Sequence, residues 1–177
     1  MSRIVPDPDS RSCEASPRVD RRLFIGLSGG FCLTVGSVHA GEIEPEAFIE
    51  YGEPFDANRV ARGDWMIVHV DGQPIFVRRR TTAEIEAART VPLEALPDPA
   101  RDEDRAPDPQ WIVVSGVCTH AGCTVSAGLG PYRGWMCLCH GSIYDLSGRV
   151  RHGPAKKNLA VIPHRMNSRG EMVLSAS

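Results

Sequence analysis

Two short stretches near the middle of the chain hold four of its six cysteines and two of its six histidines. They are CTHAGC, residues 118–123, and CLCHGS, residues 137–142. A cysteine and a histidine lie two positions apart in the first stretch and three positions apart in the second. Each stretch can therefore present one thiolate and one imidazole to a common centre, and the fold has to bring the two loops together.

Two thiolates and two imidazoles form the ligand set of a [2Fe-2S] cluster in which cysteines hold one iron and histidines the other. One cysteine then remains in each loop, and these two could form a disulfide that joins the loops. The pairs and the remaining cysteines are Cys118 with His120, Cys137 with His140, and Cys123 and Cys139.

Other chemistries account for less of this pattern. Zinc could bind the same four ligands, although structural zinc sites usually have at least two residues between paired cysteines. A c-type haem needs Cys-x-x-Cys-His, whereas CLCH has one residue between its cysteines. A thiol redox pair or a purely structural double disulfide would leave both histidines unexplained.

The loops are predicted to lie at the ends of strands in a β-rich domain. The chain has 17 glycines and 14 prolines but only 6% aromatic residues, which favours a turn-rich β protein. DWMIVHV and QPIFVRR, on either side of Asp71-Gly72, predict a hairpin with a two-residue turn. WIVVSGV, residues 111–117, predicts a buried strand that leads into the first loop, and YRGWM leads into the second.

An insertion separates the hairpin from the strand at 111–117. Thr81 and Glu84 have the spacing of a capping box, which predicts the start of a short helix. Residues 92–109 are rich in Pro, Asp and Arg, and they predict a long surface loop.

The N-terminal part is predicted to be separate from this domain. Residues 1–20 are polar and predict a disordered cytoplasmic tail. Residues 21–41 begin with two arginines and continue as an uncharged run, which predicts a transmembrane anchor with a twin-arginine-like signal. Cleavage after Ala40 and a buried helix of a soluble domain are the alternatives. Residues 42–52 are predicted to form a hinge, and residues 53–177 the folded domain.

CTHAGC and CLCHGSIYDLSGRVRHGPA resemble the Rieske iron–sulfur subunits of ubiquinol–cytochrome c reductase, the cytochrome bc complex. PIFVRRRTTAEIEAAR, DPQWIVVSGVCTHAGC and SGRVRHGPAKKNL follow the family in the same order and cover most of residues 64–159. The resemblance implies an all-β fold: a Rieske-type antiparallel β-sandwich head with a short helix and loop insertion, preceded by a single N-terminal transmembrane helix. The sequence departs from the family at Ala121, Leu138 and Lys156, where Leu, Pro and Pro are usual.

The resemblance also implies one Rieske [2Fe-2S] cluster per chain and assigns its ligands. Cys118 and Cys137 would bind one iron, and His120 and His140 the other. The two histidines would also be the catalytic groups, because a ring nitrogen could accept a hydrogen bond from quinol.

Four further residues receive roles from the same resemblance. Cys123 and Cys139 would form the disulfide. Ser142 would donate a hydrogen bond to a bridging sulfide, and Tyr144 would donate one to the sulfur of Cys118, so that both would contribute to cofactor binding.

The function implied is that of an electron-transfer subunit of quinol–cytochrome c reductase, an oxidoreductase active as part of its complex. Its partners would be cytochrome b, a c-type cytochrome, ubiquinol and the membrane. The location expected is the bacterial cytoplasmic membrane, crossed once, with the head in the periplasm, where a disulfide can form. The net charge of -2 and the lack of a polybasic segment exclude nucleic acid as a partner. The alternatives are a diffusible periplasmic Rieske electron carrier and, in a different class, a zinc-stabilised interaction module.

Overall fold

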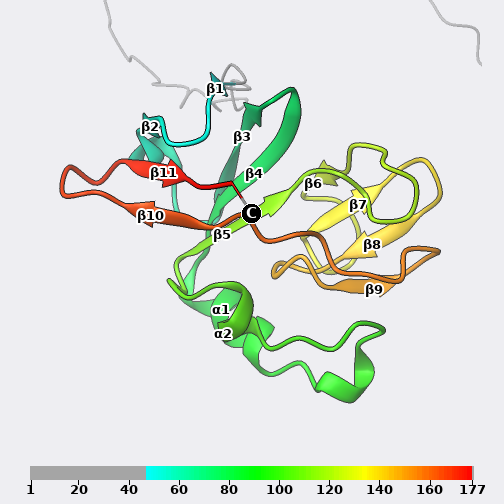
Figure 1. Cartoon of the computed structure of the whole chain (residues 1–177). Coiled ribbons are helices and arrows are strands. Elements are labelled where there is room, and N and C mark those ends of the chain that lie inside the picture. Colours follow the sequence, from blue (N-terminus) through cyan, green and yellow to red (C-terminus); the bar gives the residue numbers. More distant parts are fainter. Residues whose placement is uncertain (1–46, 177) are drawn as a thin grey trace, which may run out of the picture. The chain divides into compact units, whose positions relative to one another are not determined.

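The structure, a computed structural model, describes residues 47–176 and shows a mostly β fold with a few short helices (Figure 1). The predicted tail and anchor and the first part of the predicted hinge lie outside the described residues. Within residues 47–176, no helix has the length and hydrophobicity of a membrane span.

The first sheet contains the predicted hairpin, which is confirmed. Its turn is formed by Asp71 at φ 50° and Gly72 at φ 72°, the left-handed conformations that a two-residue hairpin turn requires. One edge departs from the antiparallel pattern because β1 pairs with β3 in parallel. The strands, in the order β1-β3-β4-β5, are β1 (Ala47–Ile49), β3 (Asp64–Val70), β4 (Gln73–Arg79) and β5 (Trp111–Ser115).

A second sheet covers one face of the first through a shared hydrophobic core. Val68 and Val70 of β3 and Ile75 and Val77 of β4 point into this core, as the two-residue period of a strand requires. Met172 joins them from the second sheet. The strands of that sheet, in the order β10-β11-β2, are β2 (Pro54–Phe55), β10 (His164–Met166) and β11 (Met172–Leu174), and a 3-10 turn, η1 (Ala57–Arg59), follows β2.

The third sheet packs against the opposite faces of β4 and β5. Phe76, Ile112 and Val114 enter a second core, in which the Phe76 and Trp135 rings lie 6.0 Å apart. β4 and β5 contribute side chains to both cores, which agrees with the unbroken apolar runs PIFV and WIVV in their sequences. The strands of this sheet, in the order β6-β7-β8-β9, are β6 (Ser126–Ala127), β7 (Trp135–Cys137), β8 (Ser142–Tyr144) and β9 (Val150–His152).

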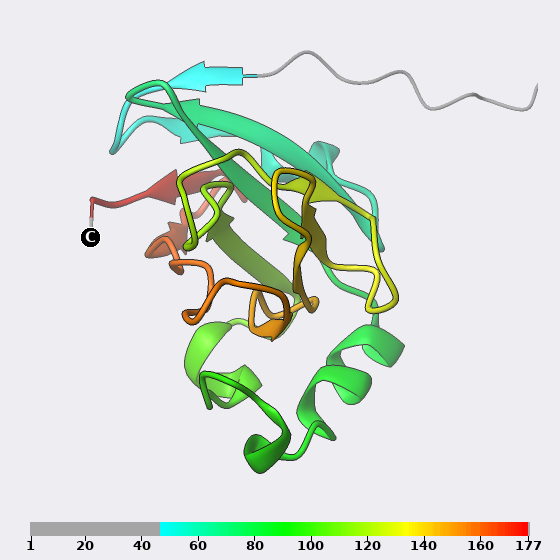
Figure 2. The ribbon, with the colours of Figure 1, turned by 90° about the vertical axis from the view of Figure 1, so that its right-hand side faces the viewer.

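The insertion forms a lobe beneath the sheets in both views of the molecule (Figures 1 and 2). The predicted capping box is present: Thr81 N–H donates to Glu84 Oε2 at 3.0 Å, and Glu84 N–H donates to Thr81 Oγ1 at 3.3 Å. The helical segments are α1 (Thr82–Arg89), η2 (Leu93–Ala95) and α2 (Asp102–Arg105).

The prediction of a surface loop at residues 92–109 is wrong in part, because buried side chains fold this segment onto the domain. Asp102, on α2, is buried and forms an ion pair with Arg80 at 2.6 Å. Arg105 donates to the backbone carbonyls of Ser147 and of Leu159. The contact between Arg105 and Ser147 holds the insertion against the turn at residues 145–149, which joins β8 to β9 of the third sheet.

Candidate metal centre

The two cysteine–histidine loops contain the same backbone turn, although the first loop joins β5 of the first sheet to β6 of the third and the second joins β7 to β8. The carbonyl of Cys118 accepts a hydrogen bond from Gly122 N–H at 2.9 Å, and the carbonyl of Cys137 accepts one from Gly141 N–H at 2.9 Å. Gly122 and Gly141 have φ values of 76° and 74°, and a Cβ on either would meet no atom within 4 Å. Both glycines are therefore needed for the left-handed backbone and not for close packing.

The structure brings the four predicted ligands together as two buried thiols and two exposed imidazoles. Cys118 and Cys137 are 2% and 1% exposed, and neither forms a disulfide. His120 and His140 are exposed, and their ring centroids lie 4.9 Å apart with the ring planes at 87°. Side chains from two separate loops thus converge, with sulfur on the inside and nitrogen at the surface.

Burial and hydrogen bonding act differently on the two thiols. Burial alone would raise the pKa of Cys118, but hydrogen bonds, led by the one from the Tyr144 hydroxyl, hold it below 9.0. Burial raises the pKa of Cys137 above 9.0, and the neighbouring Cys118 adds to the rise. The hydrogen bonds from Tyr144 and Ser142 thus favour the thiolate form of Cys118.

A disulfide joins the loops through Cys123 and Cys139, whose Cα atoms are 6.6 Å apart. This is the pairing that the resemblance implies. The sulfur of Cys137 lies within 4.8 Å of both sulfurs of the bridge. The disulfide thus closes the site beside one of the buried thiols and ties the two loops to one another.

Two hydroxyl groups face the buried thiols. Tyr144 Oη lies 3.3 Å from Cys118 Sγ, and burial raises the pKa of Tyr144 to about 12, so this hydroxyl keeps its proton. Ser142 is fully buried, and its oxygen accepts from Ala155 N–H at 3.2 Å, which leaves its own proton for another acceptor. Its hydroxyl also helps to lower the pKa of Cys118.

A third segment, residues 153–157, completes the site, and motif spacing alone does not identify it. Gly153 has φ 100°, and a Cβ there would lie 2.5 Å from the Cα of Ser142, so a larger residue would displace the second loop. Thr119 Oγ1 donates to the carbonyl of Lys157 at 2.6 Å and lies 3.1 Å from Tyr144 Oη. The Gly-Pro pair at 153–154 is the only sequence signal for this close approach.

The three departures from the family pattern lie at the surface. Ala121, Leu138 and Lys156 are all exposed, and Leu138 is 67% exposed. None of them belongs to the hydrophobic core that contains Cys118 and Cys137, and none is one of the four predicted ligands.

This donor set fits a [2Fe-2S] cluster with mixed cysteine and histidine ligation. Two buried sulfur donors, two imidazoles and two hydroxyl groups facing sulfur are the groups that such a cluster needs. The disulfide cysteines are occupied with one another and leave the other four side chains as the available ligands.

Comparison with known proteins agrees with this chemistry. The family model for the Rieske [2Fe-2S] domain matches residues 55–163. The mitochondrial Rieske subunit of the cytochrome b-c1 complex from Neurospora crassa is 45% identical over 119 residues, covering 67% of this chain and 52% of that protein. The corresponding subunit from Schizosaccharomyces pombe is 47% identical over 106 residues, covering 60% and 46%. The chain thus spans about half the length of the curated relatives it matches.

One solved structure among the matches is the cyanobacterial plasma membrane Rieske protein PetC3 from Synechocystis PCC 6803. It is 19% identical with a TM-score of 0.42, covering 63% of this chain and 86% of that chain.

The predicted location in a bacterial cytoplasmic membrane, with the head in the periplasm, is wrong. The curated relatives from Neurospora crassa, Schizosaccharomyces pombe, Saccharomyces cerevisiae and Solanum tuberosum are all named as mitochondrial. The cysteine–histidine loops follow the chemistry of their cofactor, which is the same in either membrane, so they carry no information about the compartment.

Proposed function

The chain belongs to the Rieske [2Fe-2S] domain family, and from this premise we propose that its two loops hold the family's cluster through two thiolates and two imidazoles. Cys118 and Cys137 would bind one iron, and His120 and His140 the other. The observation that carries the proposal is the convergence of two buried thiols and two exposed imidazoles from loops joined by a disulfide.

The activity that we propose is electron transfer within a cytochrome bc complex, as an oxidoreductase subunit. When bound, the cluster supplies a one-electron acceptor. His120 and His140 lie at the surface, so a quinol hydroxyl can reach an imidazole ring nitrogen directly, and that nitrogen can accept its proton. The names of the relatives, Rieske subunits of the cytochrome b-c1 complex, support this assignment.

The surrounding residues would hold the ligands and adjust the charge on sulfur. Tyr144 Oη lies 3.3 Å from Cys118 Sγ and would donate to the thiolate, which favours the more negative, reduced state. Ser142 has a buried hydroxyl proton that can be given to a sulfide. The disulfide between Cys123 and Cys139 limits how far the two loops can separate.

The proposed partners are cytochrome b, a c-type cytochrome and ubiquinol. The architecture proposed is an antiparallel β-sandwich head, joined by a hinge to a single transmembrane helix at 21–41 and an N-terminal tail at 1–20. The hinge predicted at 42–52 is narrowed to the residues before Ala47, because Ala47–Ile49 forms β1 of the first sheet. Support for the anchor comes from the arginine pair and the uncharged run of the sequence.

Metal analysis and electron paramagnetic resonance test the proposal. Purified full-length protein should contain two irons and two acid-labile sulfides per chain, the composition of a [2Fe-2S] cluster. Ascorbate should reduce the cluster and produce its resonance signal. Zinc without sulfide, in a colourless protein with no redox signal, would instead establish the zinc-stabilised interaction module.

A further inference from the structure

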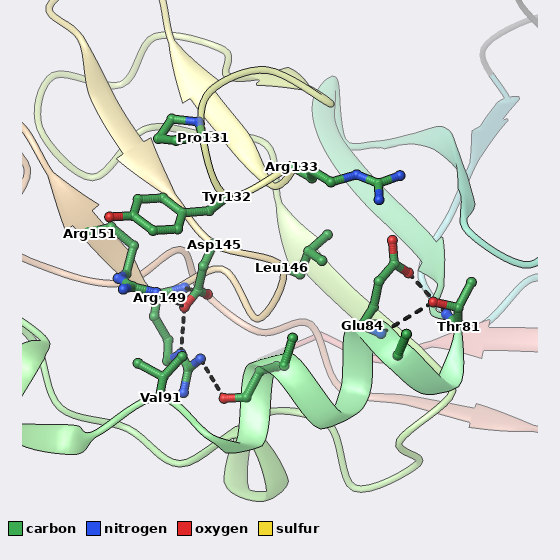
Figure 3. A pocket seen from close by; sticks show the side chains of 13 residues that line it. Thr81, Glu84, Val91, Pro131, Tyr132, Arg133, Asp145, Leu146, Arg149 and Arg151 are labelled. Carbon is green, nitrogen blue, oxygen red and sulfur yellow. Dashed lines mark hydrogen bonds and ion pairs between the residues drawn. The ribbon is translucent and has the colours of Figure 1, made fainter.

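A cavity of about 470 Å³ lies between α1 and the segment that joins β6 to β7 (Figure 3). No residue of the two cysteine–histidine loops lines it. Its walls are mainly apolar and come from α1, from the β6–β7 segment and from the β8–β9 turn. The apolar residues are Ala83, Ala87, Ala88, Val91, Pro131 and Leu146. Its volume falls within the range of about 300–1,000 Å³ that is usual for small-molecule sites.

The two carboxylates of the cavity are already occupied. Glu84 accepts from Arg78 at 2.7 Å and from Thr81 N–H at 3.0 Å. Asp145 accepts from Arg149 at 2.9 Å and from Ser147 N–H at 2.9 Å, and Arg151 lies 3.4 Å away. A cationic ligand would therefore find no free carboxylate in the cavity.

The cationic side chains of the cavity are only partly occupied. Arg149 is buried and bonded to Asp145 and to the carbonyl of Ala88. Arg151 is shared between Asp145 and the face of the Tyr132 ring, which lies 4.1 Å from its guanidinium carbon. The guanidinium of Arg133 has no hydrogen bond or ion pair with any residue of the described part of the chain.

Arg133 also has a backbone conformation that favours glycine. Its φ is 54°, in the left-handed region, and its N–H closes a turn with the carbonyl of Gly130 at 3.3 Å. A long side chain in such a conformation is strained, and strain of this kind is concentrated at functional sites. Figure 3 shows this side chain extending along the cavity toward Glu84, with Leu146 nearby.

We propose that this cavity binds a small organic acid, with the carboxylate at Arg133 and the apolar body against α1. The ligand should be an anion, because the Arg133 guanidinium has no partner among the described residues while the carboxylates of Glu84 and Asp145 already accept hydrogen bonds. The apolar walls and the Tyr132 ring give the chemistry of the remainder of the ligand.

The test uses 4-phenylbutyrate and its neutral amide as a matched pair of probes. Each is titrated into the full-length, cluster-loaded protein, and binding is followed by ligand-observed NMR. The acid should bind saturably, and the amide should bind at least about tenfold more weakly, because it lacks the charge that Arg133 recognises.

Three variants locate the site. Arg133→Gln keeps the length of the side chain but removes its charge, and should weaken binding of the acid at least about tenfold. Ala87→Leu fills the cavity from an exposed helical position and should abolish binding of both probes. Arg169→Ala removes an exposed arginine in the β10–β11 turn, outside the cavity, and should bind the acid as the parent does.

The stability of one further variant provides an independent measurement. Arg133→Gly removes the guanidinium and relieves the left-handed strain, so it should lose binding while its unfolding midpoint stays the same or rises. Equal binding of acid and amide, full binding by Arg133→Gln, or no saturable binding of the acid at about 10 mM would each overturn the proposal.

Discussion

The buried ion pair between Arg80 and Asp102 predicts that the insertion is essential for the stability of the domain. The two side chains are both 0% exposed, with Arg80 Nη1 2.6 Å from Asp102 Oδ1 and a second contact at 3.3 Å. Asp102 also accepts from the hydroxyl of Ser147, in the β8–β9 turn. The Asp102→Ala variant would leave the guanidinium buried without a counter-charge.

The expected loss is about 3–5 kcal/mol, the usual effect of removing one partner from a buried pair. This is a large share of the roughly 5–15 kcal/mol that stabilises a typical protein. At a slope of about 1–3 kcal/mol per molar urea, the midpoint of urea unfolding should fall by about 1 M or more. Tryptophan fluorescence of the cluster-loaded protein measures this midpoint.

A matched control comes from the neighbouring residue of α2. Glu103 is 55% exposed and lies 3.4 Å from Arg89, so Glu103→Ala should cost less than about 1 kcal/mol. The double variant Arg80→Met with Asp102→Leu removes both charges and should recover much of the loss. A loss below about 1 kcal/mol for Asp102→Ala, or a double variant as unstable as the single one, would refute the reasoning.

Three further predictions follow from the site and the insertion. Tyr144→Phe removes the hydroxyl 3.3 Å from Cys118 Sγ and should lower the midpoint potential by some tens of millivolts in a redox titration; an unchanged midpoint would contradict this role. Cys139→Ser opens the disulfide and should accelerate loss of iron and lower the potential, and wild-type retention of iron would argue against the bridge. Burial raises the pKa of Glu84, but hydrogen bonds from Thr81 and Arg78 outweigh it and hold the pKa below 4.5. Its contribution to stability should therefore be complete above about pH 4.5 and be lost as the pH falls through the folded-state pKa, so the difference in unfolding midpoint between the parent and Glu84→Gln should shrink in acid.

Features that depend on neighbouring residues could be predicted from the sequence. The Asp71-Gly72 turn and the capping box of Thr81 and Glu84 need only the local chain, because the turn depends on backbone conformation and the cap on a three-residue spacing. The convergence of the two loops could be predicted from their composition. Each loop carries half of one ligand set, so the two halves must meet at one metal centre.

Features that depend on distant partners could not be predicted. Asp102 lies in a segment rich in charge and proline, and such residues are usually exposed, so its burial with Arg80 has no local signal. The parallel pairing of β1 with β3 likewise depends on the path of the connection between them, which contains β2 of the second sheet.

The same distinction applies to the environment of the ligand sulfur. The motif predicts that Cys118 is a ligand, but contacts with residues distant in the sequence determine the surroundings of its sulfur. Asp98, in the insertion, accepts a hydrogen bond from Asn158 N–H at 2.9 Å. The carbonyl of Lys157, in the same peptide group as that N–H, accepts one from Thr119 Oγ1 at 2.6 Å. Thr119 in turn lies 3.1 Å from the Tyr144 hydroxyl that contacts Cys118 Sγ. The insertion and the ligand loop are therefore parts of one hydrogen-bonded unit, and a change in the insertion can alter the sulfur without touching any motif residue.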